Sequence, residues 1–136
     1  WVSSLLNPFG FPARLRKSFE NGDFHAVISD HILEEIADVL NRPRIKEKYR
    51  INDTDIKELL VLIEERSQYV LLSGDITICR DIDDNLIIET AIKGQAEFLV
   101  TRDDDIKSDA HVSSFLSQFK ISVISVTKFL ARLKNV

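Results

Sequence analysis

Short apolar runs alternate with amphipathic segments along most of the chain. Four runs of β-favouring residues predict strands, at residues 24–28, 69–72, 98–101 and 121–126. Elsewhere apolar residues recur every three or four positions, which is the period of one helix face. The helices expected from this pattern lie at 13–20, 30–40 and 44–49, in a long stretch that begins at Asp53, and at 84–93, 110–119 and 127–134.

Residues suited to helix boundaries support these elements. Pro12 fits the first turn of a helix, whereas Asn21-Gly22 and Gly94 fit helix ends. The residues expected to cap helix N-termini are Ser29 or Asp30, Asp53 and Thr127.

The alternation of helices and short strands favours an α/β fold with a parallel sheet that is covered on both faces. We expect residues 1–136 to form a single domain, because 136 residues is a typical length for one. Sheets of this kind bind ligands beyond the carboxyl ends of their strands. The first places to look for a site are therefore the residues that follow Ile28, Leu72, Val100 and Val126.

Composition narrows the class of protein. Apolar residues make up 44% of the chain and charged residues 29%, which is typical of a globular protein and excludes disorder or a collagen-like repeat. Cys79 is the only cysteine, so an internal disulfide is excluded. No apolar run is long enough to span a membrane, and we expect a cytoplasmic protein without a membrane partner. The chain begins at Trp1 and contains no methionine, so we expect an N-terminal segment that this sequence lacks.

Charge limits how nucleic acid could bind. The formal net charge of −4 argues against a broad basic surface, so any contact with nucleic acid is expected to be local or to pass through a metal ion. One local stretch, residues 42–50, carries five cations and one acid. It is either a solvated face or a contact for the phosphate backbone. The candidate phosphate-binding residues are Arg42, Arg44, Lys46 and Lys48.

Acidic residues gather where the predicted strands end. Residues 103–105 are three consecutive aspartates shortly after Val100, Glu34 and Glu35 follow Ile28 by about one helical turn, and three aspartates lie between 81 and 84. Crowded carboxylates repel one another, and a bound divalent cation such as Mg²⁺ or Mn²⁺ would offset that repulsion. The alternative is that these acids cap helices or face solvent.

Taken in order, these segments resemble a PIN domain, and in particular the branch described as toxins of toxin–antitoxin systems. The ordered set of segments is more specific than any single motif, and it includes a D-x-x-D-N run at 81–85 and a T-x-D-x-D run at 101–105. The matching stretches are residues 1–6, 12–15, 29–40, 42–44, 79–85, 98–106 and 124–130.

The resemblance implies a three-layer α/β/α sandwich with a parallel sheet of four or five strands. It also implies cleavage of RNA phosphodiester bonds that depends on Mg²⁺ or Mn²⁺, with RNA as substrate and a cognate antitoxin protein as partner, and it leaves a homodimer open. The implied catalytic residues, which would also bind the metal, are Glu35, Asp84 and Asp103. Asp105 is implied as a further metal ligand, and Asp81 and Thr101 as accessory residues.

The sequence departs from the family at one place. The family's first acid lies in an Asp-Thr-Asn run at the end of a central strand, just before the stretch that matches Trp1, and that run is absent here. Its absence favours an alternative function, a catalytically inactive PIN-like module that binds RNA or protein, whereas the four acids that are present oppose it. A receiver-type phosphoryl-transfer domain would need a lysine at a strand end, and around the nearest candidate, Lys128, the acids do not follow the required order.

Overall fold

The computed structural model describes residues 10–101 and 109–134 of the chain. The chain divides into two compact units, Trp1–Tyr69 and Val70–Val136. Each unit has its own pair of parallel strands and its own apolar core.

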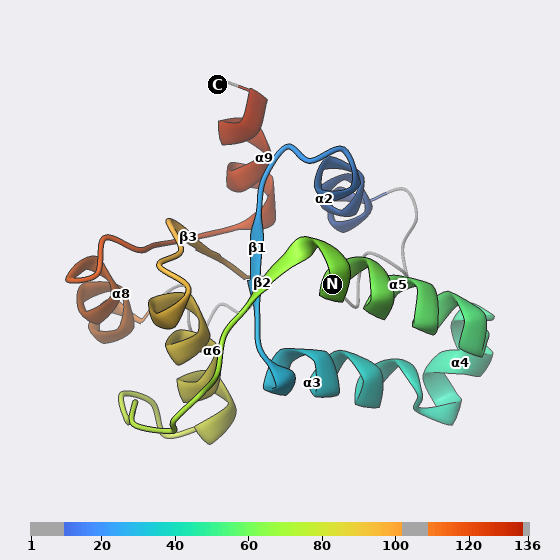
Figure 1. Ribbon diagram of the computed structural model, residues 1–136, viewed down its shortest axis with the longest axis horizontal. Coiled ribbons are helices and arrows are strands. Elements are labelled where there is room, and N and C mark those ends of the chain that lie inside the picture. The colour runs from blue at the N-terminus through green and yellow to red at the C-terminus, as the bar shows by residue number, and fades with distance from the viewer. Residues whose placement is uncertain (1–9, 102–108, 135–136) are drawn as a thin grey trace. The chain divides into compact units, whose positions relative to one another are not determined.

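The first unit is built mainly from helices around one strand pair (Figure 1). Its elements are α2 (Phe11–Glu20), β1 (Ala26–Ile28), α3 (Asp30–Leu40), α4 (Pro43–Tyr49), α5 (Asp53–Arg66) and β2 (Ser67–Tyr69). β1 and β2 run parallel, with Ile28 opposite Tyr69. Helices α3 and α5 pack against each other, and α5 also packs against β1. The buried side chains that form this core are Ile28, Ile36, Leu40, Ile51, Ile56, Leu59 and Ile63.

The start of α5 lies one residue earlier than the cap predicted from the sequence. Asn52, not Asp53, is the N-cap: its side-chain oxygen accepts a hydrogen bond from the Asp55 N–H at 2.8 Å. The Asp55 carboxylate accepts in return from the Asn52 N–H at 3.1 Å. This reciprocal capping box needs an acid three residues after the cap, which Asn52 has in Asp55. Asp53 is instead the first helical residue and forms an ion pair with Lys46.

Strand β2 is also shifted from its predicted position. The apolar run at 69–72 predicted a strand there, but the strand occupies Ser67–Tyr69 and follows α5 directly. Its register is set by the three residues of β1, and β1 ends at Ile28 because α3 starts at Asp30. Beyond Tyr69 the chain leaves the pair, so Leu71 is 74% exposed although it is apolar.

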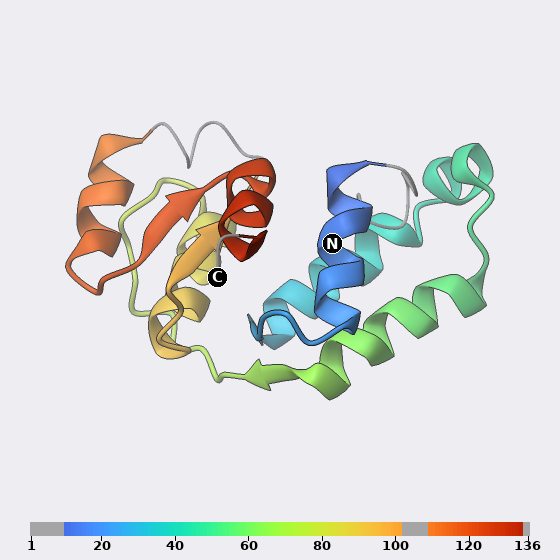
Figure 2. The same ribbon diagram turned by 90° about the horizontal axis from the view of Figure 1, so that it is seen from above.

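The second unit contains the other strand pair, whose arrows lie side by side in Figure 2. Its elements are α6 (Ile82–Lys93), β3 (Phe98–Val100), α8 (Ala110–Ser117), β4 (Ser122–Ile124) and α9 (Val126–Lys134). β3 and β4 run parallel, with Leu99 opposite Val123. The buried side chains of this core are Ile88, Ala91, Val112, Leu116 and Ile121.

Two helix boundaries of this unit differ in detail from the prediction. Ser125, not Thr127, caps α9, because its hydroxyl accepts from the Lys128 N–H at 3.2 Å. Gly94 follows α6 as predicted but keeps a right-handed conformation, and the left-handed residue is Gln95, with φ of 53°. The α/β class and the parallel pairing of strands are confirmed. A single sheet of four or five strands stays a prediction, since the described strands form two separate pairs.

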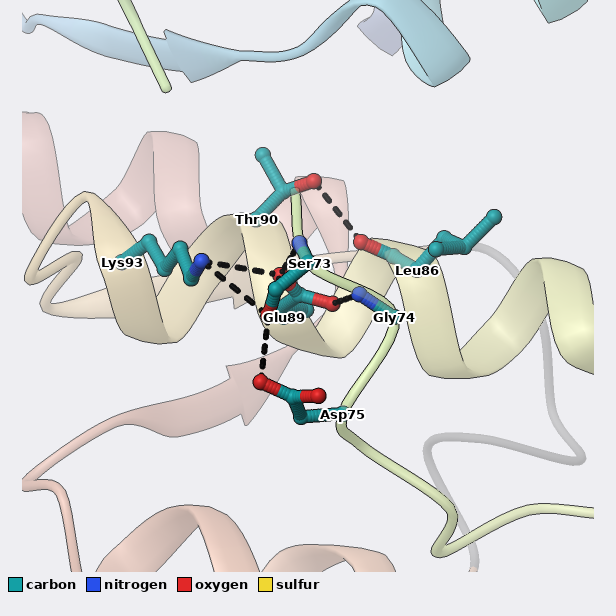
Figure 3. Close-up of polar contacts among 7 residues, drawn as sticks. All are labelled: Ser73, Gly74, Asp75, Leu86, Glu89, Thr90 and Lys93. Atoms are coloured by element: carbon teal, nitrogen blue, oxygen red, sulfur yellow. Dashed lines mark hydrogen bonds and ion pairs between the residues drawn. The ribbon is translucent and has the colours of Figure 1, made fainter. Parts of the chain in front are cut away.

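The segment between β2 and α6 has no regular secondary structure and is held by side chains of α6. The buried Asn85 accepts from the Cys79 N–H at 2.7 Å and donates to the Cys79 carbonyl at 3.0 Å. One turn further on, Glu89 accepts from the backbone N–H groups of Ser73 at 2.5 Å and Gly74 at 2.8 Å (Figure 3). Lys93 lies 3.3 Å from the Glu89 carboxylate. We call Asn85, Glu89 and Lys93 the polar face of α6.

The ionised form of Glu89 is favoured by these donors. Burial alone would raise the pKa of Glu89, but the N–H groups of Ser73 and Gly74, the Lys93 ammonium and the Ser73 hydroxyl together hold that pKa below its usual value. A pKa that is lower in the folded state stabilises the fold above the pKa of the unfolded chain. That contribution is lost as the pH falls through the folded-state pKa.

We predict that Glu89→Gln lowers the free energy of unfolding at pH 7 by about 1–3 kcal/mol, the cost of losing hydrogen bonds to a buried charge. The difference from the unsubstituted protein should shrink as the pH is lowered below about 4.3, where the carboxyl of the unfolded chain is protonated. Urea unfolding of both proteins between pH 7 and pH 3 measures it. The matched control is Glu97→Gln at an exposed position, which should leave the free energy of unfolding nearly unchanged. If the free energy of unfolding of Glu89→Gln differs from that of the unsubstituted protein by the same amount at every pH, the ionised state assigned to Glu89 is contradicted.

Candidate functional site

The D-x-x-D-N run forms the N-terminal turn of α6. Asp81 is the N-cap, and its carboxylate accepts from the Asp83 N–H at 2.9 Å. Asp84 follows in the first turn and is partly buried, whereas Asp81 is exposed. Negative charge is stabilised at a helix N-terminus by the helix dipole. The capping role considered for Asp81 is therefore present in the structure, and Asp84 has a defined place one helical turn away.

Asn85 fixes this turn to the preceding segment. Its side-chain amide bonds both backbone groups of Cys79, as a neighbouring strand would. Because Asn85 directly follows Asp84, this contact sets how the first turn is rotated about the helix axis. The last residue of the D-x-x-D-N run thus orients the acids that precede it.

Cys79 lies among acidic side chains of the second unit. Burial raises the pKa of the Cys79 thiol, and the negative charges of Asp84, Asp109 and Asp81 raise it further. These three carboxylates therefore lie near enough to Cys79 for their charges to act on its thiol. Asp109 was not identified from the sequence. It caps α8, accepting from the N–H groups of His111 at 2.9 Å and Val112 at 3.2 Å, and an aspartate just before a predicted helix is the signal that could have revealed it.

Thr101 directly follows β3, at the carboxyl end of that strand. Its N–H donates to the Ile124 carbonyl at 3.1 Å and so continues the β3–β4 pairing by one bond. The predicted site residues that come next, Asp103 and Asp105, lie outside the described residues.

Glu35 belongs to the first unit, on α3. It is exposed, and its carboxylate lies 3.9 Å from Nε2 of His31, one turn earlier in the helix. The next residue, Ile36, is buried in the core. Since Glu35 and Asp84 lie in separate units, their predicted convergence with Asp103 stays a prediction.

A tyrosine lies at the carboxyl end of the β1–β2 pair and was not identified from the sequence. A hydrogen bond with Asp30 is the largest of the effects that raise the pKa of Tyr69, and the charges of Glu34 and Glu64 act in the same direction. The signal that could have revealed it is an exposed aromatic residue at a strand end, but the strand was predicted to begin, not end, at Tyr69. Asp30, Glu34 and Tyr69 thus make this edge of the first unit acidic and polar.

The oxygen donors among the predicted metal ligands have the right chemistry for a hard cation. The carboxylates of Glu35 and Asp84 suit Mg²⁺ and Mn²⁺. Within residues 10–101 and 109–134, no group of three or more His, Cys, Asp or Glu side chains is placed to hold a metal ion. The predicted ligand set also includes Asp103 and Asp105.

The basic stretch forms α4 and its flanks. Arg42 is the N-cap residue of α4, and Arg44 is exposed in its first turn. The ammonium of Lys48 lies 5.3 Å from the ring centre of Tyr49. The charge of Lys46 is compensated by its ion pair with Asp53, so the cations exposed toward solvent are chiefly the others.

Comparison with known proteins gives the family. The family model described as PIN domain matches residues 1–105. An uncharacterized protein of Methanocaldococcus jannaschii is 29% identical over 108 residues, which are 79% of this chain and 68% of that protein. No solved structure matches significantly. Among the helices of the described residues, none combines the length and apolarity that a membrane span requires. PIN domains generally are nucleases that use divalent metal ions, and with the match over most of its length this chain belongs to the PIN-domain family.

Proposed function

We propose that the protein is a metal-dependent endoribonuclease that hydrolyses RNA phosphodiester bonds and is the toxin of a toxin–antitoxin pair. The family match over residues 1–105 supports the nuclease class. The observation that best supports the proposal is the placement of Asp84 in the first turn of α6, three residues after the N-cap Asp81. Its position is fixed by the neighbouring Asn85 rather than left to a free surface turn.

Each predicted site residue has a role in this proposal. Glu35, Asp84, Asp103 and Asp105 would hold the Mg²⁺ or Mn²⁺ ion through carboxylate oxygens. When bound, such an ion lowers the pKa of a coordinated water and stabilises negative charge on phosphate oxygens. Asp81 holds the first turn of α6 in place, and the Thr101 hydroxyl, at the end of β3, would orient neighbouring groups. The two units would together form one PIN-like domain, and a homodimer is compatible with it.

Substrate and inhibitor would bind by complementary charge. RNA phosphates would contact Arg42 and Arg44, whose guanidinium groups suit bidentate binding of phosphate. Lys48 would add positive charge on the same segment, and Lys46, which is paired with Asp53, would add less. The inhibitor would be a cognate antitoxin protein that covers the acidic site.

A catalytically inactive module that binds RNA or protein is the second candidate. It is favoured by the exposure of Glu35 and its pairing with His31, which are typical of a solvated helix face. The two candidates differ in whether removal of one acid changes a rate of RNA cleavage.

We predict that Asp84→Asn lowers the rate of Mn²⁺-dependent RNA cleavage by at least about 100-fold, since loss of a group that only supports a metal ligand already costs about 10–100-fold. Asn keeps the shape of the side chain but removes its charge. Cleavage of a labelled single-stranded RNA, with Mn²⁺ and then with chelator, measures the effect. Asp83→Asn is the matched control in the same helical turn and should retain most of the activity. Equal rates for the unsubstituted protein and Asp84→Asn, or cleavage that is insensitive to chelator, would contradict the proposal.

We predict that replacing both Arg42 and Arg44 by Ala raises KM for RNA and leaves kcat nearly unchanged, because contacts to phosphate position the substrate without entering the chemistry. The dependence of RNA affinity on salt should weaken, by about 0.7 in the logarithmic slope for each phosphate that the variant no longer neutralises. Filter binding at several salt concentrations measures that slope. Lys57→Ala, at an exposed position of α5, controls for the removal of charge alone. An unchanged slope in the double variant would assign phosphate binding to another surface.

A further inference from the structure

Glu89 is a buried acid for which the proposed reaction has no use. Its side chain is 2% exposed, although ionised carboxylates are rarely buried without a specific partner. It accepts from the backbone N–H groups of Ser73 and Gly74, from the Ser73 hydroxyl at 3.2 Å, and pairs with Lys93 (Figure 3). All of these partners except Lys93 belong to the segment that precedes α6.

Glu89 acts together with its neighbours on the polar face of α6. Asn85, Glu89 and Lys93 are spaced four residues apart, so they lie on one side of the helix. Asn85 holds Cys79, and Glu89 holds Ser73 and Gly74. The segment therefore runs along the helix and is fastened at two points.

The segment between the two points depends on these contacts. None of residues 70–81 belongs to a helix or strand, so their backbone groups need partners outside regular structure. Gly74 has φ of 80°, a left-handed conformation that glycine adopts without strain and that turns its N–H toward Glu89. Ile76 and Ile78 pack against the apolar core of the second unit.

The fastened segment ends at the acids of the candidate site. It leads through Cys79 directly into Asp81, the N-cap of α6, and Asp84 lies in the turn that follows. Asp81 and Asp84 both lie near enough to the Cys79 thiol for their charges to raise its pKa. A shift of the segment along α6 would therefore move Asp81, where the segment ends, and would change the surroundings of the Asp84 carboxylate in the helix.

We propose that Glu89 is a positioning residue, which holds the 73–79 segment on α6 and so fixes Asp81 and Asp84 in the geometry that the site needs. The proposal rests on the proposed function only in assigning a role in RNA cleavage to these two acids. A buried carboxylate is a costly way to gain stability, because apolar side chains of similar size often stabilise a core as well. The benefit of a carboxylate at position 89 is that it holds two backbone N–H groups, which an apolar side chain could not do.

The test compares Glu89→Gln with two controls in the full chain. Gln keeps the size of the side chain, but it replaces one of the two oxygens, each of which accepts from a different N–H group, by an NH₂ group that can only donate. Lys128→Gln removes an exposed cation elsewhere in the same unit and leaves every contact of Glu89 in place. Glu97→Gln removes a negative charge elsewhere in the same unit.

Three measurements are made on each variant. Amide hydrogen exchange reports on the fastening of Ser73 and Gly74. The ¹³C carboxyl resonances of Asp81 and Asp84 report on the surroundings of these acids. Steady-state cleavage of RNA with Mn²⁺ separates kcat from KM.

For Glu89→Gln we expect exchange at Ser73 and Gly74 to become about tenfold faster, which corresponds to about 1.4 kcal/mol. The Asp81 and Asp84 resonances should shift, and kcat should fall by about tenfold, as for other groups that support a catalytic site, with little change in KM. Both controls should stay close to the unsubstituted protein.

Faster exchange with unchanged Asp81 and Asp84 resonances and unchanged kcat would overturn the proposal and leave Glu89 a purely structural residue. Unchanged exchange would overturn it as well. If the unsubstituted protein does not cleave RNA, the proposed function fails, and the two carboxyl resonances alone decide whether Glu89 positions the acids.

Discussion

The structure of the second unit depends on how an irregular segment satisfies its backbone hydrogen bonds. Residues 70–81 belong to no helix or strand, so where their backbone groups are shielded from water the partners have to come from outside regular structure. Side chains on one face of α6 supply such partners, with an amide at Asn85 and a carboxylate at Glu89. The same contacts lead the chain into Asp81 and Asp84, so the fastening of a loop and the placement of the candidate acids are one physical arrangement.

Each unit relies on helix packing more than on its strands. The four strands among the described residues are three residues long each, and an isolated two-stranded pair of that size is not stable by itself. The core of the first unit comes from α3 and α5 around Ile28, and that of the second from α6 and α8 around Ile88. The pairing of the strands fixes the positions of the residues at their carboxyl ends, such as Tyr69 in β2 and Thr101 after β3.

Local features of the fold could be predicted from the sequence, whereas features set by distant contacts could not. Periodicity placed the helices to within a few residues, and the capping role that was the alternative for the acids at 81–84 is observed for Asp81. The strand predicted at 69–72 was wrong, because the register with β1 rather than the apolar run decides where β2 lies.

In the candidate site, too, local features could be predicted from the sequence and features set by distant contacts could not. The D-x-x-D-N run was visible in the sequence because its residues are adjacent. The burial of Glu89 was not, since an acid in a helix usually faces solvent and its partners lie 15 and 16 residues earlier. Asp109 was missed for a similar reason: its electrostatic effect on Cys79, 30 residues earlier, comes from the folded arrangement and not from any spacing in the chain.

The proposed nuclease function requires that Glu35 and Asp84 bind the same metal ion. Its most direct test is a titration of the ¹³C-carboxyl-labelled protein with Mn²⁺, whose unpaired electrons broaden the resonances of nearby nuclei. A shared ion predicts that the Glu35 and Asp84 resonances broaden together at one Mn²⁺ concentration, while the exposed Glu97 resonance stays sharp. Broadening of Asp84 without Glu35, at any concentration that leaves Glu97 sharp, or no selective broadening of either, would contradict it.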